Sequence, residues 1–208
     1  MDVGGFLARR IRNRRSSRLN LLLIMRTKSA YLLCAAVVLV ADQLSKVWAT
    51  TSLKPVPYVE VIPGLFRLSY ATNRGVAFSL FADSQFDIRW ILSAVSLIAA
   101  LFVLSYFRRA PADKPWLNVS LALLMAGIVG NMIDRVRLGE VVDFIELHWQ
   151  SLYSWPTFNV ADSAICVGAV LLALEMLREE RAARVRSIGG VEAPTPAPEE
   201  TGVGSSES

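Results

Sequence analysis

The chain has 208 residues, a length that suits a single domain. Apolar residues (Ala, Val, Ile, Leu, Met, Phe, Trp, Tyr and Cys) make up 53% of it and charged residues only 19%. The apolar residues gather in four long blocks with most charges between them, which indicates a membrane protein and excludes a disordered chain. The net charge of +4 indicates no nucleic-acid partner, because the basic residues flank the apolar blocks, where lipid head groups and membrane topology account for them.

Cysteine and histidine are too scarce for the common metal sites. The chain has two cysteines and one histidine, which excludes a site built on several His ligands and any zinc spacing of Cys and His. Cys34 and Cys166 both fall inside apolar blocks, where a small core residue is more common than a disulfide partner. We therefore expect no metal and no cofactor.

The start of the chain is strongly basic. Residues 1–28 hold eight Lys or Arg and one acid, Asp2. A basic segment before an apolar run resembles a signal peptide, but this run is too long and lacks a small-residue cleavage pattern. We expect a basic cytoplasmic N-terminal arm over 1–28, followed by a retained span. Met25 would itself make a sensible start, and a native N-terminal peptide that begins upstream of Met25 would refute that hypothesis.

The four apolar blocks are predicted to be transmembrane helices. At about 1.5 Å per residue each block approaches the roughly 30 Å thickness of the hydrocarbon core. Helices are expected because lipid offers no partners to backbone groups. The spans cover about 29–49, 90–107, 116–135 and 159–177. They form one membrane domain over 29–178, and residues 179–208 are expected to be a cytoplasmic, largely disordered tail rich in Gly, Pro, Ser, Thr and Glu.

The basic residues also predict the topology. They are frequent in the arm, in the 108–115 loop and after the fourth span, but sparse in segments 50–87 and 136–158. Both termini and the short middle loop are therefore expected to be cytoplasmic, and the two longer connections to face outward. Within the first of these, Tyr58–Tyr70 is apolar on both sides of Pro63-Gly64, which predicts short strands around a turn.

Charged residues inside a span are energetically costly, so each is expected to have a structural or functional role. Asp42 and Lys46 are four residues apart on one helix face and can pair, either as a structural lock or as groups that orient a catalytic acid or a substrate. Asp134 and Arg135 are adjacent and point apart. For this second pair we favour a structural role.

Two amide–carboxylate pairs repeat one spacing. Asn131 lies three residues before Asp134, and Asn159 lies three residues before Asp162. Each pair therefore shares a helix face. Such pairs often serve as hydrogen bonds between membrane helices.

The topology predicts a layer of acids at one outward depth. Asp143, just beyond the third span, and Asp162, at the outer end of the fourth, fall in this layer with Asp42, Asn73 and Asp134. Two neighbouring carboxyls share a proton, so one can act as a base on water and the other as an acid toward a carbonyl, the chemistry of aspartic peptide hydrolysis. The spacing alone leaves open a proton- or cation-coupled transporter, and a structural subunit whose polar pairs only bind helices together.

Five motifs occur in order over about residues 30–178. They are Asp42-Gln43-Leu44-Ser45-Lys46; Asn73-Arg74-Gly75-Val76-Ala77-Phe78-Ser79; Gly130-Asn131-Met132-Ile133-Asp134-Arg135; Val141-Val142-Asp143-Phe144; and Phe158-Asn159-Val160-Ala161-Asp162-Ser163. Together they closely resemble the lipoprotein signal peptidase (signal peptidase II) family, the bacterial intramembrane aspartyl proteases. Each motif alone is weak, whereas five in order are specific.

The resemblance implies a fold, an activity and a set of residues. The fold would be an all-α membrane protein of four transmembrane helices with a small extracytoplasmic β-cradle, here over about residues 56–82. The catalytic dyad would be Asp143 and Asp162, and the enzyme would remove the signal peptide of a prolipoprotein just before a cysteine that carries diacylglycerol. Supporting or substrate-facing roles would fall to Asp42, Lys46, Asn73, Gly75, Asn131, Asp134, Arg135, Asn159 and Ala161.

The resemblance also implies a location and partners. The protein would be a multi-pass protein of the bacterial cytoplasmic (inner) membrane, with both termini cytoplasmic and its active site toward the outer leaflet. Its partners would be the diacylated prolipoprotein and membrane lipids, and we expect a monomer. The basic arm and the acidic tail lie outside the resemblance and are assigned no catalytic part.

Overall fold

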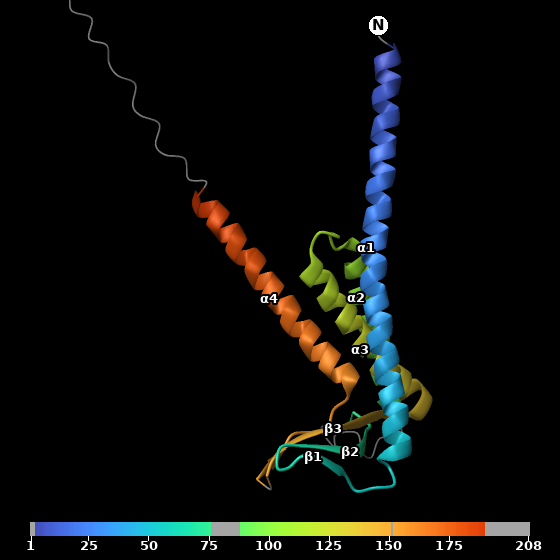
Figure 1. The fold of residues 1–208 in the computed structure, drawn as a ribbon, viewed down its shortest axis with the longest axis vertical. Coiled ribbons are helices and arrows are strands. Elements are labelled where there is room, and N and C mark those ends of the chain that lie inside the picture. Colours follow the sequence, from blue (N-terminus) through green and yellow to red (C-terminus); the bar gives the residue numbers. More distant parts are fainter. Residues whose placement is uncertain (1–2, 76–87, 151, 190–208) are drawn as a thin grey trace, which may run out of the picture.

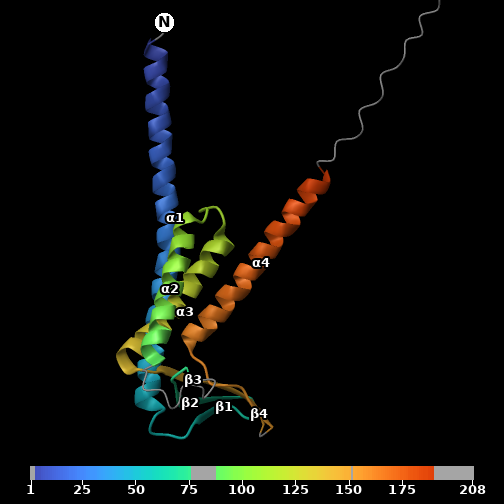
Figure 2. The ribbon, with the colours of Figure 1, turned by 180° about the vertical axis from the view of Figure 1, so that it is seen from behind.

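The computed structural model describes residues 3–75, 88–150 and 152–189, with side chains described within 28–185. Four helices and a four-stranded antiparallel sheet make up most of this part of the chain (Figure 1). The sheet lies at one end of the helices, and the N-terminus lies at the opposite end of the first helix (Figures 1 and 2). The predicted fold of four long apolar helices with a small sheet is confirmed.

Each of the four helices contains an apolar stretch long enough to cross a bilayer. The stretches have 25, 22, 24 and 26 residues in chain order. Each includes one of the blocks that the sequence predicts to span the membrane. The helices are α1 Val3–Ser52, α2 Ile88–Arg109, α3 Pro115–Leu138 and α4 Val160–Gly189.

The first and last helices extend beyond the predicted spans. α1 begins at Val3, so most of the expected basic arm continues the helix of the first span. α4 runs to Gly189, so residues 179–189 are helical where the sequence predicts the start of a disordered tail. Extension is favourable because an existing helix gains one hydrogen bond for each residue that is added. The remaining tail, 190–208, and Met1 lie outside the described residues.

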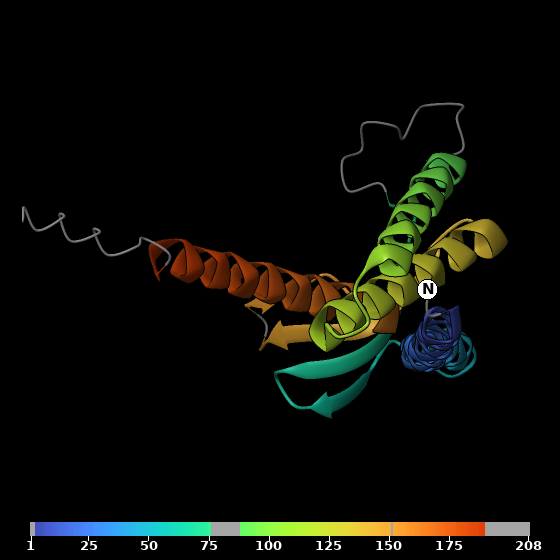
Figure 3. The same cartoon turned by 90° about the horizontal axis from the view of Figure 1, so that it is seen from above.

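α3 lies at the centre of the helices and packs against the other three (Figure 3). Glycines bring α3 and α4 close together: a Cβ on Gly127 would lie 2.3 Å from the carbonyl oxygen of Ala161, and one on Gly168 would lie 2.9 Å from that of Ser120. Close backbone approach is typical of membrane helices, where lipid supplies little hydrophobic drive for association. The start of α4 is thereby held against α3.

The sheet has the order β1-β2-β3-β4 with antiparallel neighbours. Its strands are β1 Val59–Ile62, β2 Phe66–Asn73, β3 Val141–Trp149 and β4 Tyr153–Ser154. β1 and β2 meet around Pro63-Gly64, as predicted. The sequence does not predict β3, which pairs with β2 and supplies a central strand. Of the expected β-cradle, residues 76–82 lie outside the described residues.

Packing at the end of α1 decides which way β3 faces. Val142 and Phe144 form a buried cluster with Ala49 of α1 and with Leu53, the residue that follows α1. Side chains alternate between the two faces of a strand, so Asp143 points away from this cluster. The strand thus places Asp143 next to the start of α4.

Candidate active site

Asp143 and Asp162 meet at one asparagine. The side-chain amide of Asn159 donates to Asp143 Oδ1 at 2.7 Å, and the backbone N–H of Asn159 donates to Asp162 Oδ2 at 3.2 Å. The backbone N–H of Asp162 in turn donates to Asn159 Oδ1 at 3.0 Å. Asn159 precedes the first residue of α4, so these reciprocal bonds form a capping box at the helix start. The spacing of three residues therefore reflects a helix cap, and the same cap holds both carboxyls.

A second asparagine connects Asp162 to the interior of the helices. Asn131 donates its amide to Asp162 Oδ1 at 2.7 Å, and Lys46 Nζ donates to Asn131 Oδ1 at 3.0 Å. A lysine ammonium can only donate, so the Asn131 oxygen faces Lys46 and its NH₂ group faces Asp162. Lys46 thus fixes which end of the amide reaches the carboxylate.

Lys46 lies in a buried cluster of three charges. Its Nζ is 3.0 Å from Asp42 Oδ2 and 2.8 Å from Asp134 Oδ2, and all three residues are buried. The Asp42–Lys46 pair expected from the helical spacing is present, and Asp134 joins it from α3. Loss of Lys46 would leave two uncompensated carboxylates in a low-dielectric interior, which makes the cluster a strong structural constraint.

The two acids of this cluster also hold the residues next to Asp143 and Asp162. Asp42 Oδ1 accepts the backbone N–H of Ala161 at 2.8 Å, and Asp134 Oδ2 accepts the backbone N–H of Val142 at 3.3 Å. Ala161 and Val142 each directly precede one of the two aspartates. Asp42 also lies at the N-terminus of α4, where the helix dipole stabilises a negative charge. A single ionic cluster thus positions both backbones of the pair.

Burial disfavours the ionised form of Asp143. Burial, and then the charge of Asp162, raise the pKa of Asp143 to about 6, against hydrogen bonds from Asn159 and Asn73 and the charge of Lys46. Two carboxyls in such proximity do not both ionise readily. The site can therefore hold one proton up to a higher pH than an ordinary aspartate would, with Asp143 as the residue that carries it.

Three other expected site residues lie around this centre. The Arg135 guanidinium interacts electrostatically with Asp162 and donates from Nη1 to the Asn131 carbonyl at 3.4 Å. Asn73 ends β2, and its Oδ1 accepts the N–H of Gly75 at 2.7 Å. Gly75 has φ +76°, a left-handed conformation that favours glycine. The remainder of its motif, residues 76–79, lies outside the described residues.

Gln43 is a site residue that the sequence analysis does not single out. Its amide donates to Asp134 Oδ1 and to Asp42 Oδ2, each at 3.1 Å, and to the Gly130 carbonyl at 3.3 Å. It therefore cross-links α1 and α3 beside Lys46. The sequence feature that could have identified Gln43 is a polar side chain inside a span, next to Asp42.

A separate polar cluster stiffens the sheet. Glu146 is buried and accepts from Arg67 at 2.6 Å, from Ser154 at 2.7 Å and from Ser69 at 2.8 Å. These bonds, that of Arg67 first, lower the pKa of Glu146 to about 2. Glu146 thus stays ionised and clamps three strands, on the element that carries Asp143.

Comparison with known proteins identifies the family of the chain. The family model described as signal peptidase (SPase) II matches residues 34–178. A lipoprotein signal peptidase of Geobacter metallireducens is 48% identical over 147 residues, which cover 70% of this chain and 89% of that protein. One of Pseudomonas aeruginosa is 42% identical over 151 residues, which cover 73% of this chain and 89% of that protein.

Solved structures give the same result. A bacterial membrane enzyme solved by the in meso method at 2.3 Å resolution is similar with a TM-score of 0.63 and 28% identity, over 73% of this chain and 90% of that one. A second, solved at 1.9 Å, has a TM-score of 0.63 and 29% identity, over 72% and 93%. The matched segment contains the second and third apolar stretches, most of the first and fourth, and the polar residues around Asn159. The chain therefore belongs to the signal peptidase II family and is a multi-pass peptidase of the bacterial inner membrane that processes lipoproteins.

Proposed function

We propose that the protein is an intramembrane aspartic endopeptidase that removes the signal peptide from diacylglyceryl-modified prolipoproteins by cutting just before the lipidated cysteine. Family membership supports the lipoprotein substrate. The observation that carries the aspartic mechanism is the shared asparagine, Asn159, which binds the carboxyls of both Asp143 and Asp162. The dyad is formed by these two residues.

The surroundings of the two carboxyls support different roles for them. Asp162 accepts two N–H groups, from the side chain of Asn131 and the backbone of Asn159, and both stabilise a carboxylate. Asp143 is more buried and has a pKa raised to about 6 by that burial and by Asp162. We assign the base to Asp162 and the acid to Asp143.

Hydrolysis then follows with one water consumed. Asp162 takes a proton from the water as its oxygen adds to the scissile carbonyl carbon, and Asp143 gives its proton to the carbonyl oxygen. In the tetrahedral diol, Asp162 returns its proton to the amide nitrogen, the C–N bond breaks, and Asp143 recovers a proton from a hydroxyl. The dyad ends in its starting state, and the products are a carboxylic acid and an amine.

Four further residues are proposed to position the dyad. Lys46 orients the amide of Asn131 toward the base, and Asp42 and Asp134 hold the backbones that precede the two aspartates. Ala161 takes part through its backbone N–H. These residues act through the dyad and do not touch the substrate.

Arg135, Asn73 and Gly75 are proposed to face the substrate. The Arg135 side chain is half-buried beside Asp162, so its guanidinium can donate to a peptide carbonyl at the dyad. Asn73 hydrogen-bonds Asp143 and lies at the end of a strand, where it can also meet the peptide. Gly75 lets the backbone approach closely because it lacks a Cβ.

The proposed orientation follows from charge and chemistry. The basic residues at the ends remote from the sheet favour cytoplasmic termini, so the sheet and the dyad face outward. Acyl chains on the substrate cysteine would stay in the outer leaflet along the apolar helix faces, with the signal helix spanning inward. The scissile bond then lies at the depth of the dyad, and a monomer contains every group that the reaction uses.

The decisive experiment is cleavage of a diacylated prolipoprotein by the purified full chain in detergent. D143N and D162N should each abolish cleavage while the protein still purifies as a folded monomer. D113N, which removes an exposed carboxylate from the loop between α2 and α3, is the matched control and should retain full activity. Full activity in either dyad variant would end the aspartic assignment.

A second substrate tests the lipid requirement separately. The same prolipoprotein without diacylglycerol should be cut poorly or not at all, because it lacks the group that holds the cysteine at the membrane surface. Mass spectrometry of the products should place the new N-terminus at the lipidated cysteine. Cleavage elsewhere, or equal cleavage of both substrates, would contradict the proposed specificity even if the dyad is correct.

A further inference from the structure

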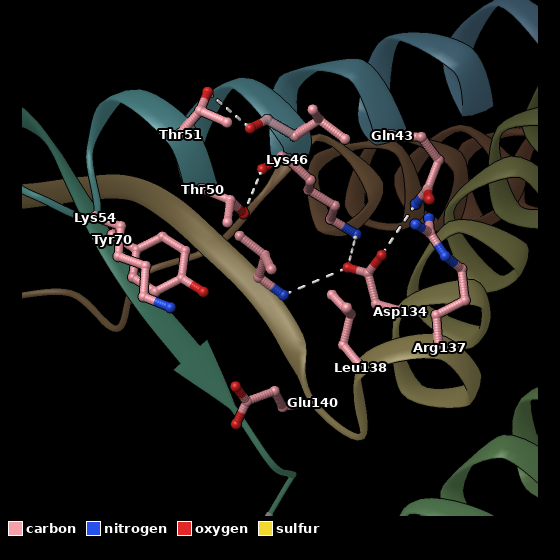
Figure 4. A pocket seen from close by; sticks show the side chains of 12 residues that line it. Gln43, Lys46, Thr50, Thr51, Lys54, Tyr70, Asp134, Arg137, Leu138 and Glu140 are labelled. Atoms are coloured by element: carbon pink, nitrogen blue, oxygen red, sulfur yellow. Dashed lines mark hydrogen bonds and ion pairs between the residues drawn. The ribbon is translucent and has the colours of Figure 1, made fainter.

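We propose that a pocket between the sheet ends of α1 and α3 binds the head group of an anionic phospholipid from the leaflet next to the sheet. The pocket has a volume of about 350 Å³, within the range of ligand pockets. Figure 4 shows Lys54 and Tyr70 on one side of it and Arg137 on the other. Asp143 and Asp162 do not line it, so the pocket is distinct from the dyad.

The pocket lies at the depth of lipid head groups. Its walls come from the last turns of α1, from the end of α3 and from Tyr70 and Val142 of the sheet. The apolar stretches of α1 and α3 end at Ser52 and Leu138, at this same junction. A molecule in the pocket would therefore lie where hydrocarbon gives way to the interface.

Two cations of the pocket are not used in ion pairs. Lys46 pairs with both Asp42 and Asp134 at the floor of the pocket, and Glu140 pairs with Arg74 at 3.3 Å. Lys54 and Arg137 are exposed and have no ion-pair partner within the described part of the chain. The Lys54 ammonium lies 5.6 Å from the centre of the Tyr70 ring, which keeps it at the pocket. Two cations on opposite walls suit a phosphate, which arginine can bind with two parallel hydrogen bonds.

Three polar groups of the wall are placed to accept hydrogen bonds. Thr50 and Thr51 give their hydroxyl protons to carbonyls of their own helix, at 2.8 Å and at 3.0 and 3.2 Å. Their oxygens, and the Glu140 carboxylate, are left to accept from a ligand. A head group that combines a phosphate with free hydroxyls matches both sets, which makes phosphatidylglycerol the appropriate probe.

An apolar stripe on α1 leads directly to the pocket. Leu33, Val37, Val40, Leu44 and Val47 are all more than half exposed and recur every three or four residues, so they share one helix face. The last of them, Val47, also lines the pocket. At about 1.5 Å per residue the stripe is roughly 20 Å long, enough to accompany an acyl chain. A lipid that lies along this stripe would put its head group between Lys54 and Arg137.

The test measures binding of short-chain phosphatidylglycerol to the purified full chain in a neutral detergent, by native mass spectrometry and by the shift in melting temperature. We expect saturable binding that phosphatidylcholine and inorganic phosphate do not reproduce. K54Q/R137Q should raise the Kd at least tenfold, whereas the charge-preserving K54R should stay within twofold of wild type. R109Q/R181Q, which removes two exposed cations at the other end of the helices, is the matched control for net charge and should also stay within twofold.

Each contrary outcome overturns the proposal. An equal loss of affinity in R109Q/R181Q would mean attraction by bulk charge and no site. Equal stabilisation by phosphatidylcholine would mean that the charges do not select the lipid, and equal stabilisation by inorganic phosphate would mean a free-anion site. Unchanged affinity in K54Q/R137Q would show that the lipid does not bind in this pocket. None of these readouts depends on peptidase activity.

Discussion

The side-chain amide of Asn159 donates to Asp143 Oδ1 at 2.7 Å, and Asn159 is also the residue that caps the helix of Asp162. The start of α4 and the spacing of the two carboxyls are therefore fixed by the same side chain. A helix cap is usually a matter of stability alone. Here the cap also reaches across to a strand, so its loss should affect chemistry more than folding.

N159A tests this relationship. Without the side-chain amide, Asp143 loses its bond to residue 159 and the N–H of Asp162 loses its cap, although the backbone N–H of residue 159 can still donate to Asp162. A displacement of about 1 Å in a reacting group can cost about 100-fold in rate. We expect kcat/KM to fall about 100-fold, mainly through kcat, with a smaller loss in thermal stability. The matched control is N118A, which removes another fully buried asparagine whose amide, among the described residues, donates to the carbonyls of Pro111 and Lys114. A similar loss of activity in both variants would contradict a specific role for Asn159.

D134N should chiefly lower stability. The neutral amide leaves Lys46 with Asp42 as its one remaining carboxylate and weakens the bond to the N–H of Val142. We expect a loss of about 2 kcal/mol, below the roughly 3–5 kcal/mol for a buried pair that is broken outright, and less than a tenfold loss of activity per folded molecule. Thermal melts in detergent measure the first quantity and cleavage assays the second.

E140Q is the control for the stability of D134N. E140Q removes the ion pair with the exposed Arg74, a type of contact that contributes about 0.5 kcal/mol or less. Its melting temperature should therefore stay close to that of wild type. If D134N melted like wild type but had lost its activity, Asp134 would be a functional residue and the structural assignment would be wrong.

The pH dependence of cleavage should report the proton on Asp143. Burial and the charge of Asp162 raise the pKa of this acid to about 6, so it keeps its proton to a higher pH than an ordinary aspartate. The proposed mechanism needs that proton, so kcat/KM should fall as the pH rises through the apparent pKa of the dyad, at about 6 or above. Rates from pH 4 to 9 with a saturating and a limiting substrate concentration measure this.

Asn73 offers a readout that a merely structural residue would not give. Its hydrogen bond lowers the pKa of Asp143, so N73A should move the falling limb of the profile to higher pH. A limb that stays in place, or moves to lower pH, would mean that another group controls the reaction.

Much of the fold was accessible from the sequence because its strongest signals are local. Long apolar blocks require helices in lipid, and a Pro-Gly turn between apolar runs predicts two strands. β3 was missed because Val141–Phe144 and its neighbours show no clear alternation, and because its pairing partner lies some 70 residues earlier. The sequence does not predict the helical extensions of α1 and α4, because charged segments resemble loops. A helix that already exists next to such a segment can nevertheless continue into it.

In the candidate site, too, some contacts follow from local sequence patterns and others depend on tertiary packing. The Asp42–Lys46 pair follows from spacing on one helix, and its presence needed no tertiary information. The bonds from Asp42 to Ala161 and from Asp134 to Val142 depend on how α1, α3 and α4 meet, which no local pattern encodes. Gln43 is not singled out from the sequence because a neutral amide costs less in a span than a charge does, and so is a weaker signal.

The contact between α3 and α4 yields a prediction whose sign is unusual. Replacement of a glycine by alanine inside an exposed helix stabilises it by about 1 kcal/mol. At Gly127 the new Cβ would lie 2.3 Å from the carbonyl oxygen of Ala161 and 2.6 Å from Ile165, so α4 would have to move. We expect G127A to lower stability by about 1 to 3 kcal/mol, the usual cost of overpacking.

The same displacement should reach the dyad, because Ala161 directly precedes Asp162 and is held by Asp42. G127A should therefore also lower kcat/KM, by at least tenfold, in the fraction that remains folded. A thermal melt and a cleavage assay on one preparation test both effects together. A rise in melting temperature, as for an unconstrained helical glycine, would show that the backbones of α3 and α4 are not in close contact at Gly127. The proposal that this contact positions Asp162 would then be wrong.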